Sequence, residues 1–436
     1  MSEARTALED KVVEAARAAR DEVVGLIAEL VACDTTARMA GDPARDEEKL
    51  QRLLAARLEA LGAQPDLWEP APTGAGSRSI PAGLDFAGRP QLAAVVPGAG
   101  TGRSLLLNGH IDAVDVEPRD QWHSDPLRAT ERDGVLYGRG VNDMKGGIAC
   151  MVVALETLQR LGVRLAGDAV FCTVTDEESS GAGGHMAVAH GVCADAGIAA
   201  EATDFDAWVS CRGTVTPTIT VAGRAGHAEM TQPDWRDGGA VNAIEKLMPL
   251  LAGIQALREE WRGRPDHRHP LLAPGDIVPT IVQGGTWIVT YPASCDLTCD
   301  ITYLPAHVDA DGTGKAVEAE VTDRLTAAVA GDAWFAEHPL RFTWSDDVVP
   351  AEMPADHPLV TTALGCARAV GRSGKPAGLD SWHDAATFTA AGTPTFSFGP
   401  DGIGSAHAVD EHVTLDGLLD FTAAIALTAM RWCGVA

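Results

Sequence analysis

The stretch VFCTVTDEESSGAGG, residues 170–184, runs from an apolar segment into three successive carboxylates, Asp176, Glu177 and Glu178. Its β-branched and aromatic residues predict a strand, and the pattern after the glycines predicts a helix near residues 183–191. Three neighbouring carboxylates repel one another unless something compensates their charge. Most acidic runs face solvent, but a cation held at the carboxyl end of the strand would also compensate them. The rest of the sequence distinguishes these two interpretations.

The sequence on both sides of this stretch alternates between short apolar segments and helical patterns. Strand-like segments such as QLAAVVPG (91–98) and SLLLNGHIDAV (104–114) are separated by helical ones, including one from about Gly146 to Leu161. This alternation predicts an α/β domain with a largely parallel sheet. Sheets of this kind bind ligands at the carboxyl ends of their strands, which is where the three carboxylates are expected.

The pattern changes near residue 213. TVTPTITVAG (214–223) alternates like a half-exposed strand, and an amphipathic stretch follows from about Gly238 to Glu260. Two further strands and a helix near residues 313–330 complete a compact α+β unit. We therefore predict a larger α/β domain formed by residues 1–212 and 333–436, interrupted by an inserted domain of residues 213–332.

Composition excludes several classes of protein. The 436 residues are 46% apolar and 22% charged, which is ordinary for a folded globular chain. A net charge of −27, from 61 acidic and 34 basic residues, disfavours binding to nucleic acid or to anionic membranes. We find neither a bilayer-length apolar run nor a signal peptide. The nine cysteines form no CxxC pair, so we expect reduced thiols and a cytoplasmic location.

Two further polar motifs follow predicted strands. SLLLNGHIDAVD places His110 and Asp112 at a strand end, where side chains two residues apart share a face. In GRGVNDMKGG (138–147), Asp143 lies between a strand-like segment and a helix. One alternative is that Asp143 caps this helix. A phosphate-binding loop is a weaker alternative, because neither GxxxxGK[ST] nor a GxGxxG after a strand is present.

Two more candidates complete the set. Glu201 ends the apolar segment ADAGIAAE, and His407 follows the predicted strand TPTFSFGP. Each alone is ordinary, but His110, Asp143, Glu178, Glu201 and His407 all lie at or just past predicted strand ends. Two imidazoles and three carboxylates are the mixed nitrogen and oxygen ligands expected for two divalent ions, with zinc or cobalt favoured.

The motifs GHIDAVD, GRGVNDMKGG, TDEESSGAGG, AAEAT and SAHAVDE occur in an order and spacing that resemble one known family. This is the acetylornithine deacetylase, succinyl-diaminopimelate desuccinylase and carboxypeptidase G family of dinuclear zinc hydrolases, which includes the aminoacylases. The resemblance extends from about residue 20 to the C-terminus. It implies a zinc-exopeptidase-like catalytic domain with an inserted ferredoxin-like domain that serves as lid and dimerisation domain.

The resemblance also implies individual roles. Asp143 would bridge the two ions, with His110 and Glu201 on one ion and Glu178 and His407 on the other. Glu177 would be the general base, and Asp112 would orient His110. His227, in TVAGRAGHAEM, would reach the partner subunit's active site in a homodimer and stabilise the tetrahedral oxyanion.

The sequence departs from the family pattern at two places. Ala202 stands where relatives usually have Pro after the metal-binding Glu, which affects local rigidity only. Thr302 stands where many relatives have an Arg that binds the carboxylate of the substrate, and a neutral Thr cannot replace a guanidinium. Either another basic residue, such as Arg212 or Arg224, takes over this task, or the substrate lacks that carboxylate.

Trp382, His383 and Asp384 occupy the region where relatives line the substrate pocket. Their aromatic and polar character would suit a ring or an amide.

We therefore expect a metal-dependent hydrolase that cleaves a C–N amide bond of a small N-acylated substrate. An N-acyl-amino-acid deacylase is the first choice and a dipeptidase or exopeptidase the second. A deformylase acting on an aminopyrimidine-like amine, or a carbamoylase, is the third. A catalytically inactive metal-binding homologue and a nucleotide-binding oxidoreductase are the alternatives from other classes. The inactive homologue would lack a metal ligand or the catalytic base. The oxidoreductase would need the GxGxxG fingerprint after a strand, which is absent.

Overall fold

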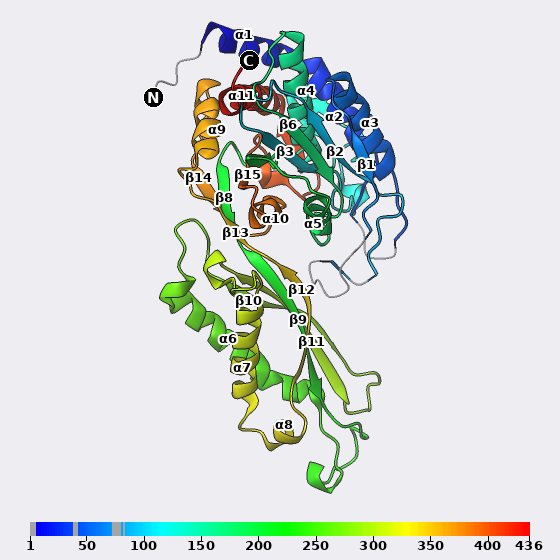
Figure 1. Cartoon of the computed structure of the whole chain (residues 1–436). Coiled ribbons are helices and arrows are strands. Elements are labelled where there is room, and N and C mark those ends of the chain that lie inside the picture. The colour runs from blue at the N-terminus through cyan, green and yellow to red at the C-terminus, as the bar shows by residue number, and fades with distance from the viewer. Residues whose placement is uncertain (1–5, 38–41, 72–79, 82) are drawn as a thin grey trace. The chain divides into compact units, whose positions relative to one another are not determined.

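The computed structural model describes residues 6–37, 42–71, 80–81 and 83–436. The chain divides into two compact units (Figure 1). Unit 1 comprises Met1–Ser210, Ala351–Gly378 and His383–Ala436, and unit 2 comprises Cys211–Pro350 and Leu379–Trp382.

Unit 1 is built around a mixed sheet whose central strands, β6, β3, β7 and β15, are parallel, as predicted. In the described residues this sheet has nine strands, with β14 (Pro376–Leu379) paired to β8 outside the main order. The order is β1 (Asp66–Trp68), β2 (Gln91–Val96), β6 (Ala169–Val174), β3 (Leu105–His110), β7 (Ala196–Ala199), β15 (Thr395–Ser397), β8 (Ala207–Cys211) and β13 (Ala351–Glu352).

Helices cover both faces of this sheet. They are α1 (Ala7–Ala18), α2 (Arg20–Val31), α3 (Glu47–Ala60), α4 (Lys145–Arg160), α5 (Ala182–Ala189), α9 (Pro358–Ala369), α10 (Ala385–Ala390) and α11 (Leu415–Cys433). The 3₁₀ turns η1 (Arg119–Gln121) and η5 (Ile403–Ser405) and a small sheet of β16 (His412–Thr414), β5 (Val135–Tyr137) and β4 (Thr130–Arg132) complete the unit.

Side chains along β3 alternate between the two faces of the unit 1 sheet, and both faces are packed against helices. Leu106 packs in a buried cluster with Ala187 of α5 and Phe388 of α10. Gly109 points to the opposite face, where an added Cβ would lie 2.6 Å from Ile148 of α4. The sheet is therefore buried on both sides, which is typical of parallel strands.

Unit 2 has the order of elements β9 (Gly213–Ala222), α6 (Ala243–Gly263), β10 (Asp276–Gly284), β11 (Ser294–Tyr303), α7 (Lys315–Val329), α8 (Ala333–Glu337) and β12 (Arg341–Val348). Its antiparallel sheet has the order β10-β11-β9-β12. This arrangement is the ferredoxin-like βαββαβ motif, with α8 as an addition. The 3₁₀ turns η2 (Trp235–Asp237), η3 (Pro265–His267) and η4 (Pro305–His307) lie in its loops.

The boundaries of unit 2 differ from the predicted range of 213–332. The sequence interpretation assigned residues after 332 to the larger domain, whereas β12 is the fourth strand of the unit 2 sheet. β9 alternates strictly between buried and half-buried residues along its length. β12 pairs with β9 on the side opposite β11, so β9 lies inside the sheet of unit 2. Residues 379–382 also belong to unit 2.

No helix in the described ranges is both long enough and apolar enough to span a membrane. All nine cysteines are free thiols, with Cys193 exposed and the others buried.

Candidate metal centre

Three parallel strands bring polar side chains to one edge of the unit 1 sheet. His110 is the last residue of β3, Glu177 and Glu178 follow β6, and Glu201 follows β7. β3 pairs in parallel with both β6 and β7, so the three carboxyl ends meet at the same edge. Asp143 lies just before α4, and His407 lies in the loop after η5.

Asp143 is the centre of this group. Its Oδ1 lies 3.0 Å from Nε2 of His110, and its Oδ2 lies 3.2 Å from Nε2 of His407. His407 Nε2 is also 3.1 Å from Oε2 of Glu178. Each oxygen of one carboxylate therefore faces a different imidazole, which is the arrangement of a ligand shared between two sites.

The remaining predicted residues of unit 1 lie beside His110. Oε1 of Glu201 is 3.6 Å from His110 Nε2, and Oε2 of Glu177 is 4.0 Å from the same atom. The structure thus brings together all five predicted ligands and the predicted base. His227 belongs to unit 2, where it is exposed and forms an isolated β-bridge with Thr290.

Asp112 makes contacts that the sequence interpretation did not predict. Nδ1 of His110 lies 2.9 Å from the main-chain carbonyl oxygen of Asp112 and 3.7 Å from its carboxylate. The carboxylate instead accepts the main-chain N–H groups of Glu177 and Glu178, at 3.3 and 3.0 Å. Asp112 thus fixes the ring of His110 through its backbone and the loop after β6 through its side chain.

The cluster concentrates negative charge in a buried place. Burial, followed by the charge of Glu201, raises the pKa of Glu177 well above its usual range, although His110 opposes this shift. Burial acts to lower the pKa of His110, but the surrounding carboxylates raise it well above 6.5. Hydrogen bonds to Asp143 and Glu178 raise the pKa of His407 to about 10. A divalent cation would displace the protons that this charge retains.

A buried ion pair that the sequence interpretation missed supports Asp143. Arg139 Nη1 lies 2.7 Å from Oε2 of Glu411, and both side chains are almost fully buried. Oε1 of Glu411 accepts the main-chain N–H groups of Asn142 and Asp143 at 3.0 and 3.1 Å. Arg139 also donates to the carbonyl oxygen of His407 at 3.4 Å. The pair therefore holds the loops of two candidate ligands together.

Glycine lets α4 approach the loop that carries Glu201. A Cβ at Gly147 would lie 1.9 Å from the carbonyl oxygen of Ala200, a distance that no side chain tolerates. The substitution of the usual Pro by Ala202 leaves this loop supported, because Oγ1 of the neighbouring Thr203 accepts the N–H of Gly399 at 3.0 Å.

The segment 382–384 divides between the two units. Trp382 belongs to unit 2 and donates to the carbonyl oxygen of Val349 at 3.2 Å. His383 and Asp384 are buried in unit 1. Burial lowers the pKa of His383 to about 4 and raises that of Asp384 to about 7.

The positions considered for binding a substrate carboxylate are engaged elsewhere within unit 2. Oγ1 of Thr302 accepts the N–H of Asp276 at 3.1 Å. The guanidinium of Arg212 donates to the carbonyl oxygens of Asp380 and Pro274 at 2.7 and 2.9 Å. That of Arg224 donates to two carbonyl oxygens of the 235–239 turn and lies 5.3 Å from the ring centroid of Trp334.

The residues present fit a pair of divalent ions. His110, Asp143 and Glu178 offer ligand atoms that all lie within 4.8 Å of one another. Oε1 of Glu178 is buried without a hydrogen-bond partner in the described part of the chain, so it is available as a ligand. Two imidazoles and three carboxylates suit borderline divalent metals such as zinc.

Comparison with known proteins agrees with this geometry. Residues 106–431 match Peptidase family M20/M25/M40. N-formyl-4-amino-5-aminomethyl-2-methylpyrimidine deformylase of Halalkalibacterium halodurans is 28% identical over 432 residues, 95% of each chain. Acetylornithine deacetylase of Proteus mirabilis is 27% identical over 401 residues, 90% of this chain and 92% of that one. Human carnosine dipeptidase 1 shares the fold, with a TM-score of 0.72 at 18% identity over 99% of this chain and 100% of that chain.

The fold and site define a hydrolase of amide bonds that depends on metal ions. The chain belongs to Peptidase family M20/M25/M40, which confirms the resemblance inferred from the motifs.

Proposed function

We propose that the protein is a deformylase that hydrolyses the N-formyl amide of an aminomethylpyrimidine and releases formate and the free amine. The similarity to the Halalkalibacterium halodurans deformylase, which covers 95% of both chains, supports this choice. This deformylase activity replaces the N-acyl-amino-acid deacylase activity that the sequence motifs alone favoured. The two candidates differ in whether the substrate carries a carboxylate.

The charge and hydrogen bonding of three side chains support the proposal. Thr302 has no charge, and the guanidinium groups of Arg212 and Arg224 donate to main-chain carbonyl oxygens. None of these positions offers a guanidinium for the bidentate ion pair that recognises a carboxylate. An N-acyl amino acid would lose this interaction, whereas a formylated aminomethylpyrimidine has no carboxylate to bind.

We further propose the following roles for the metal centre. Asp143 would bridge two divalent ions, zinc or cobalt, with His110 and Glu201 holding one and Glu178 and His407 holding the other. When bound, such ions polarise a carbonyl group and lower the pKa of water to roughly 7.

The chemistry of the chain's own residues centres on Glu177. Its carboxylate accepts a proton from the attacking water as the water oxygen bonds to the formyl carbon. Glu177 then delivers that proton to the amine nitrogen as the C–N bond breaks, so that formate and amine leave. Asp112 holds Glu177 in place by accepting its main-chain N–H.

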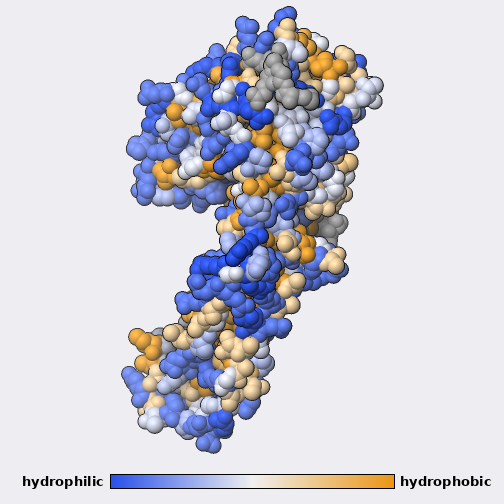
Figure 2. All heavy atoms as spheres, turned by 90° about the vertical axis from the view of Figure 1, so that its left-hand side faces the viewer, coloured by the Kyte–Doolittle hydropathy of each residue, from blue (hydrophilic) through white to orange (hydrophobic). Residues whose placement is uncertain are grey.

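We also propose that unit 2 forms a homodimer. β10 is an edge strand, and unpaired edges favour association with another strand. Ile281 and Val282 on this strand and Trp287 and Ile288 in the segment after it are exposed hydrophobic side chains, and the lower part of Figure 2, which is unit 2, shows hydrophobic residues at the surface among hydrophilic ones. These four side chains have 51–93% of their surface exposed.

His227 lies beside this surface. Ala228 and Thr290 line a hollow of about 720 Å³ together with Trp287 and Ile288, and Thr290 forms a β-bridge with His227. Dimerisation through this surface would place His227 next to the partner chain, where it would stabilise the oxyanion of the partner's reaction.

A reducing compartment such as the cytoplasm suits the nine free thiols, and we propose that location.

The proposed substrate is tested by a panel assayed with metal-loaded protein. The panel contains the N-formyl aminomethylpyrimidine, the N-acetyl and N-carbamoyl derivatives of the same amine, N-acetylornithine and a dipeptide. We expect the highest kcat/KM for the formyl compound. A higher value for N-acetylornithine or for the dipeptide would overturn the proposed substrate while leaving the amide hydrolase class intact. No cleavage of any compound by protein that holds two ions would favour an inactive homologue.

A further inference from the structure

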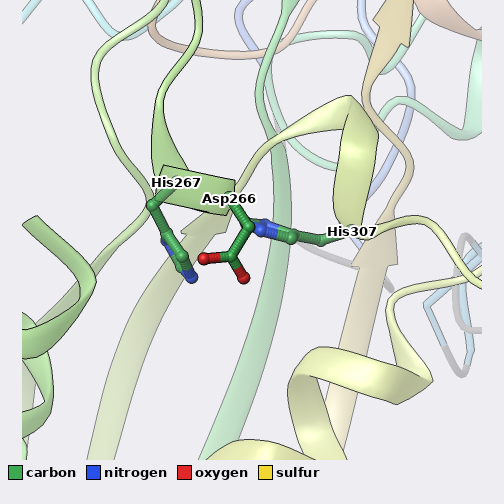
Figure 3. A group of neighbouring side chains, drawn as sticks. All are labelled: Asp266, His267 and His307. Atoms are coloured by element: carbon green, nitrogen blue, oxygen red, sulfur yellow. The ribbon is translucent and has the colours of Figure 1, made fainter. Parts of the chain in front are cut away.

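A second group of metal-binding residue types lies entirely within unit 2. Asp266 and His267 belong to η3, directly after α6, and His307 belongs to η4, directly after β11. Each residue offers a ligand atom, and these atoms all lie within 4.8 Å of one another. Figure 3 shows the three side chains pointing toward one another from two separate turns.

The ring nitrogens of both imidazoles in this group are buried. His267 is 2% exposed, and neither of its ring nitrogens makes a hydrogen bond in the described part of the chain. His307 is half-buried; both of its ring nitrogens are shielded from solvent, and the main chain of Asp266 is a polar group that faces them. Most buried polar side-chain atoms have a hydrogen-bond partner, so the ring nitrogens of His267 require an explanation.

Ring stacking explains only part of the arrangement. The ring of His267 lies 4.7 Å from that of Trp261 and 4.2 Å from that of His307, between centroids. In the same unit, His338 stacks on Trp334 at 3.6 Å, but its Nδ1 lies 3.2 Å from a carbonyl oxygen. A stacked His can thus satisfy its nitrogens in this fold. Packing alone therefore does not account for the two unpaired nitrogens of His267.

The charges around the group favour a cation. Asp266 accepts two hydrogen bonds from Arg264, at 3.1 and 2.6 Å, and Arg264 also pairs with Glu320. Two carboxylates thus surround one guanidinium, which leaves a net negative charge. A carboxylate has about four lone-pair sites, so Asp266 can bind Arg264 and a metal ion together. Burial lowers the pKa of both histidines, and the neutral imidazole is the form that binds metal.

We propose that Asp266, His267 and His307 bind a divalent transition-metal ion, zinc first, at a site separate from the amidase centre. Two imidazoles and one carboxylate are a common set of three protein ligands for zinc, with water as the fourth ligand. The ion links η3 to η4, and thereby the end of α6 to the end of β11. Its effect is to stabilise unit 2, because it binds only the folded arrangement of the two turns.

The test uses the full-length protein and counts bound zinc after dialysis against a zinc buffer. We expect His307→Gln to bind about one ion per chain fewer than the wild type, because one of three protein ligands is lost. His338→Gln is the matched control, since it changes a stacked His of the same unit whose nitrogen already has a partner. It should bind the same number of ions as the wild type. Equal zinc content in wild type and His307→Gln, or an equal loss in both variants, would overturn the proposal.

A second variant keeps the test decisive if His307→Gln does not fold. Asp266 is exposed, so Asp266→Asn leaves the packing of Trp261 and His267 in place. We expect the zinc affinity of this site to fall by more than the roughly 10-fold to 100-fold that loss of a ligand's hydrogen-bond partner costs. The wild type should also gain thermal stability on filling the site, and Asp266→Asn should gain less. Unchanged affinity and an unchanged thermal shift in Asp266→Asn would contradict the site.

Discussion

The carboxylate of Asp112 accepts the main-chain N–H of Glu178 at 3.0 Å. This hydrogen bond connects the residues after β3 to the loop after β6, across two neighbouring parallel strands. The same carboxylate also accepts the N–H of Glu177 at 3.3 Å. One buried side chain therefore positions both the proposed base and a proposed ligand, and it explains how two adjacent glutamates keep separate directions.

Asp112→Asn tests this positioning role. An amide has one acceptor oxygen, and its NH₂ group would oppose one of the two N–H groups that the carboxylate now accepts. We expect metal affinity to fall by roughly 10-fold to 100-fold, as for other partners that orient metal ligands, together with a lower kcat. Equilibrium dialysis and steady-state kinetics measure both effects. Wild-type affinity and kcat would show that these hydrogen bonds have no positioning role.

Glu177→Gln separates base catalysis from metal binding. The substitution keeps the size of the side chain but removes the group that accepts the proton, so kcat should fall by at least the roughly 10²-fold to 10⁴-fold typical of a general base. The metal content should remain that of the wild type. Glu178→Gln is the control, and it should lose metal. Loss of metal in Glu177→Gln would assign Glu177 to coordination instead.

Glu411→Gln breaks the buried pair beneath Asp143. Arg139 would remain as an unpaired buried charge, and such changes cost about 3–5 kcal/mol of the free energy of unfolding. The exposed pair Arg52–Glu48 on α3 provides a control, because removing a surface ion pair costs about 0–1 kcal/mol. Urea unfolding of Glu411→Gln and Glu48→Gln measures the difference. Similar losses in both variants would mean that the buried pair does not hold the site.

His383 predicts a specific dependence of stability on pH. Its pKa is about 4 in the folded chain and 6.5 when exposed, so between these values only the unfolded chain binds the proton. The stabilisation is fully present above pH 6.5 and is lost as the pH falls toward 4. His383→Asn does not titrate there. Between pH 7 and 5 it should therefore lose about 2 kcal/mol less stability than the wild type. Parallel losses measured by urea unfolding would show that His383 is not the titrating group.

The proposed dimer predicts complementation between two inactive variants. His227→Ala keeps its own Glu177, and Glu177→Ala can supply His227 to a partner. Mixing and reassociating the two should restore up to about one quarter of the wild-type activity, because half of the dimers are mixed and each has one complete site. The separate variants are the controls. A mixture that remains as inactive as its components would show that His227 does not act across a dimer.

Three of the candidate ligands could be predicted from the sequence because each lies at or just past the end of a strand. His110, Glu178 and Glu201 stand at the ends of β3, β6 and β7, whose apolar residues mark the strands clearly. The parallel pairing of these strands then brings the three residues together. Their proximity thus follows from a pattern that is local in the sequence.

Other features depend on contacts between distant parts of the chain, which no local pattern encodes. Arg139 and Glu411 are 272 residues apart, yet they form the buried pair behind Asp143. Asp112 was expected to orient His110, and its carboxylate lies 3.7 Å from Nδ1 of His110; the main-chain N–H groups from the loop after β6 that the same carboxylate accepts could not be predicted locally. The end of unit 2 was placed too early because β12 is identified by its pairing with β9 and not by its composition.

The position of the metal ions around Asp143 tests the proposed dinuclear centre most directly. Anomalous diffraction from crystals of zinc-loaded protein should show two ions on either side of this carboxylate, roughly 3.5–4 Å apart. One should lie beside His110 and Glu201, and the other beside His407 and Glu178. A single ion, or two ions that do not share Asp143, would contradict the dinuclear centre on which the proposed reaction depends.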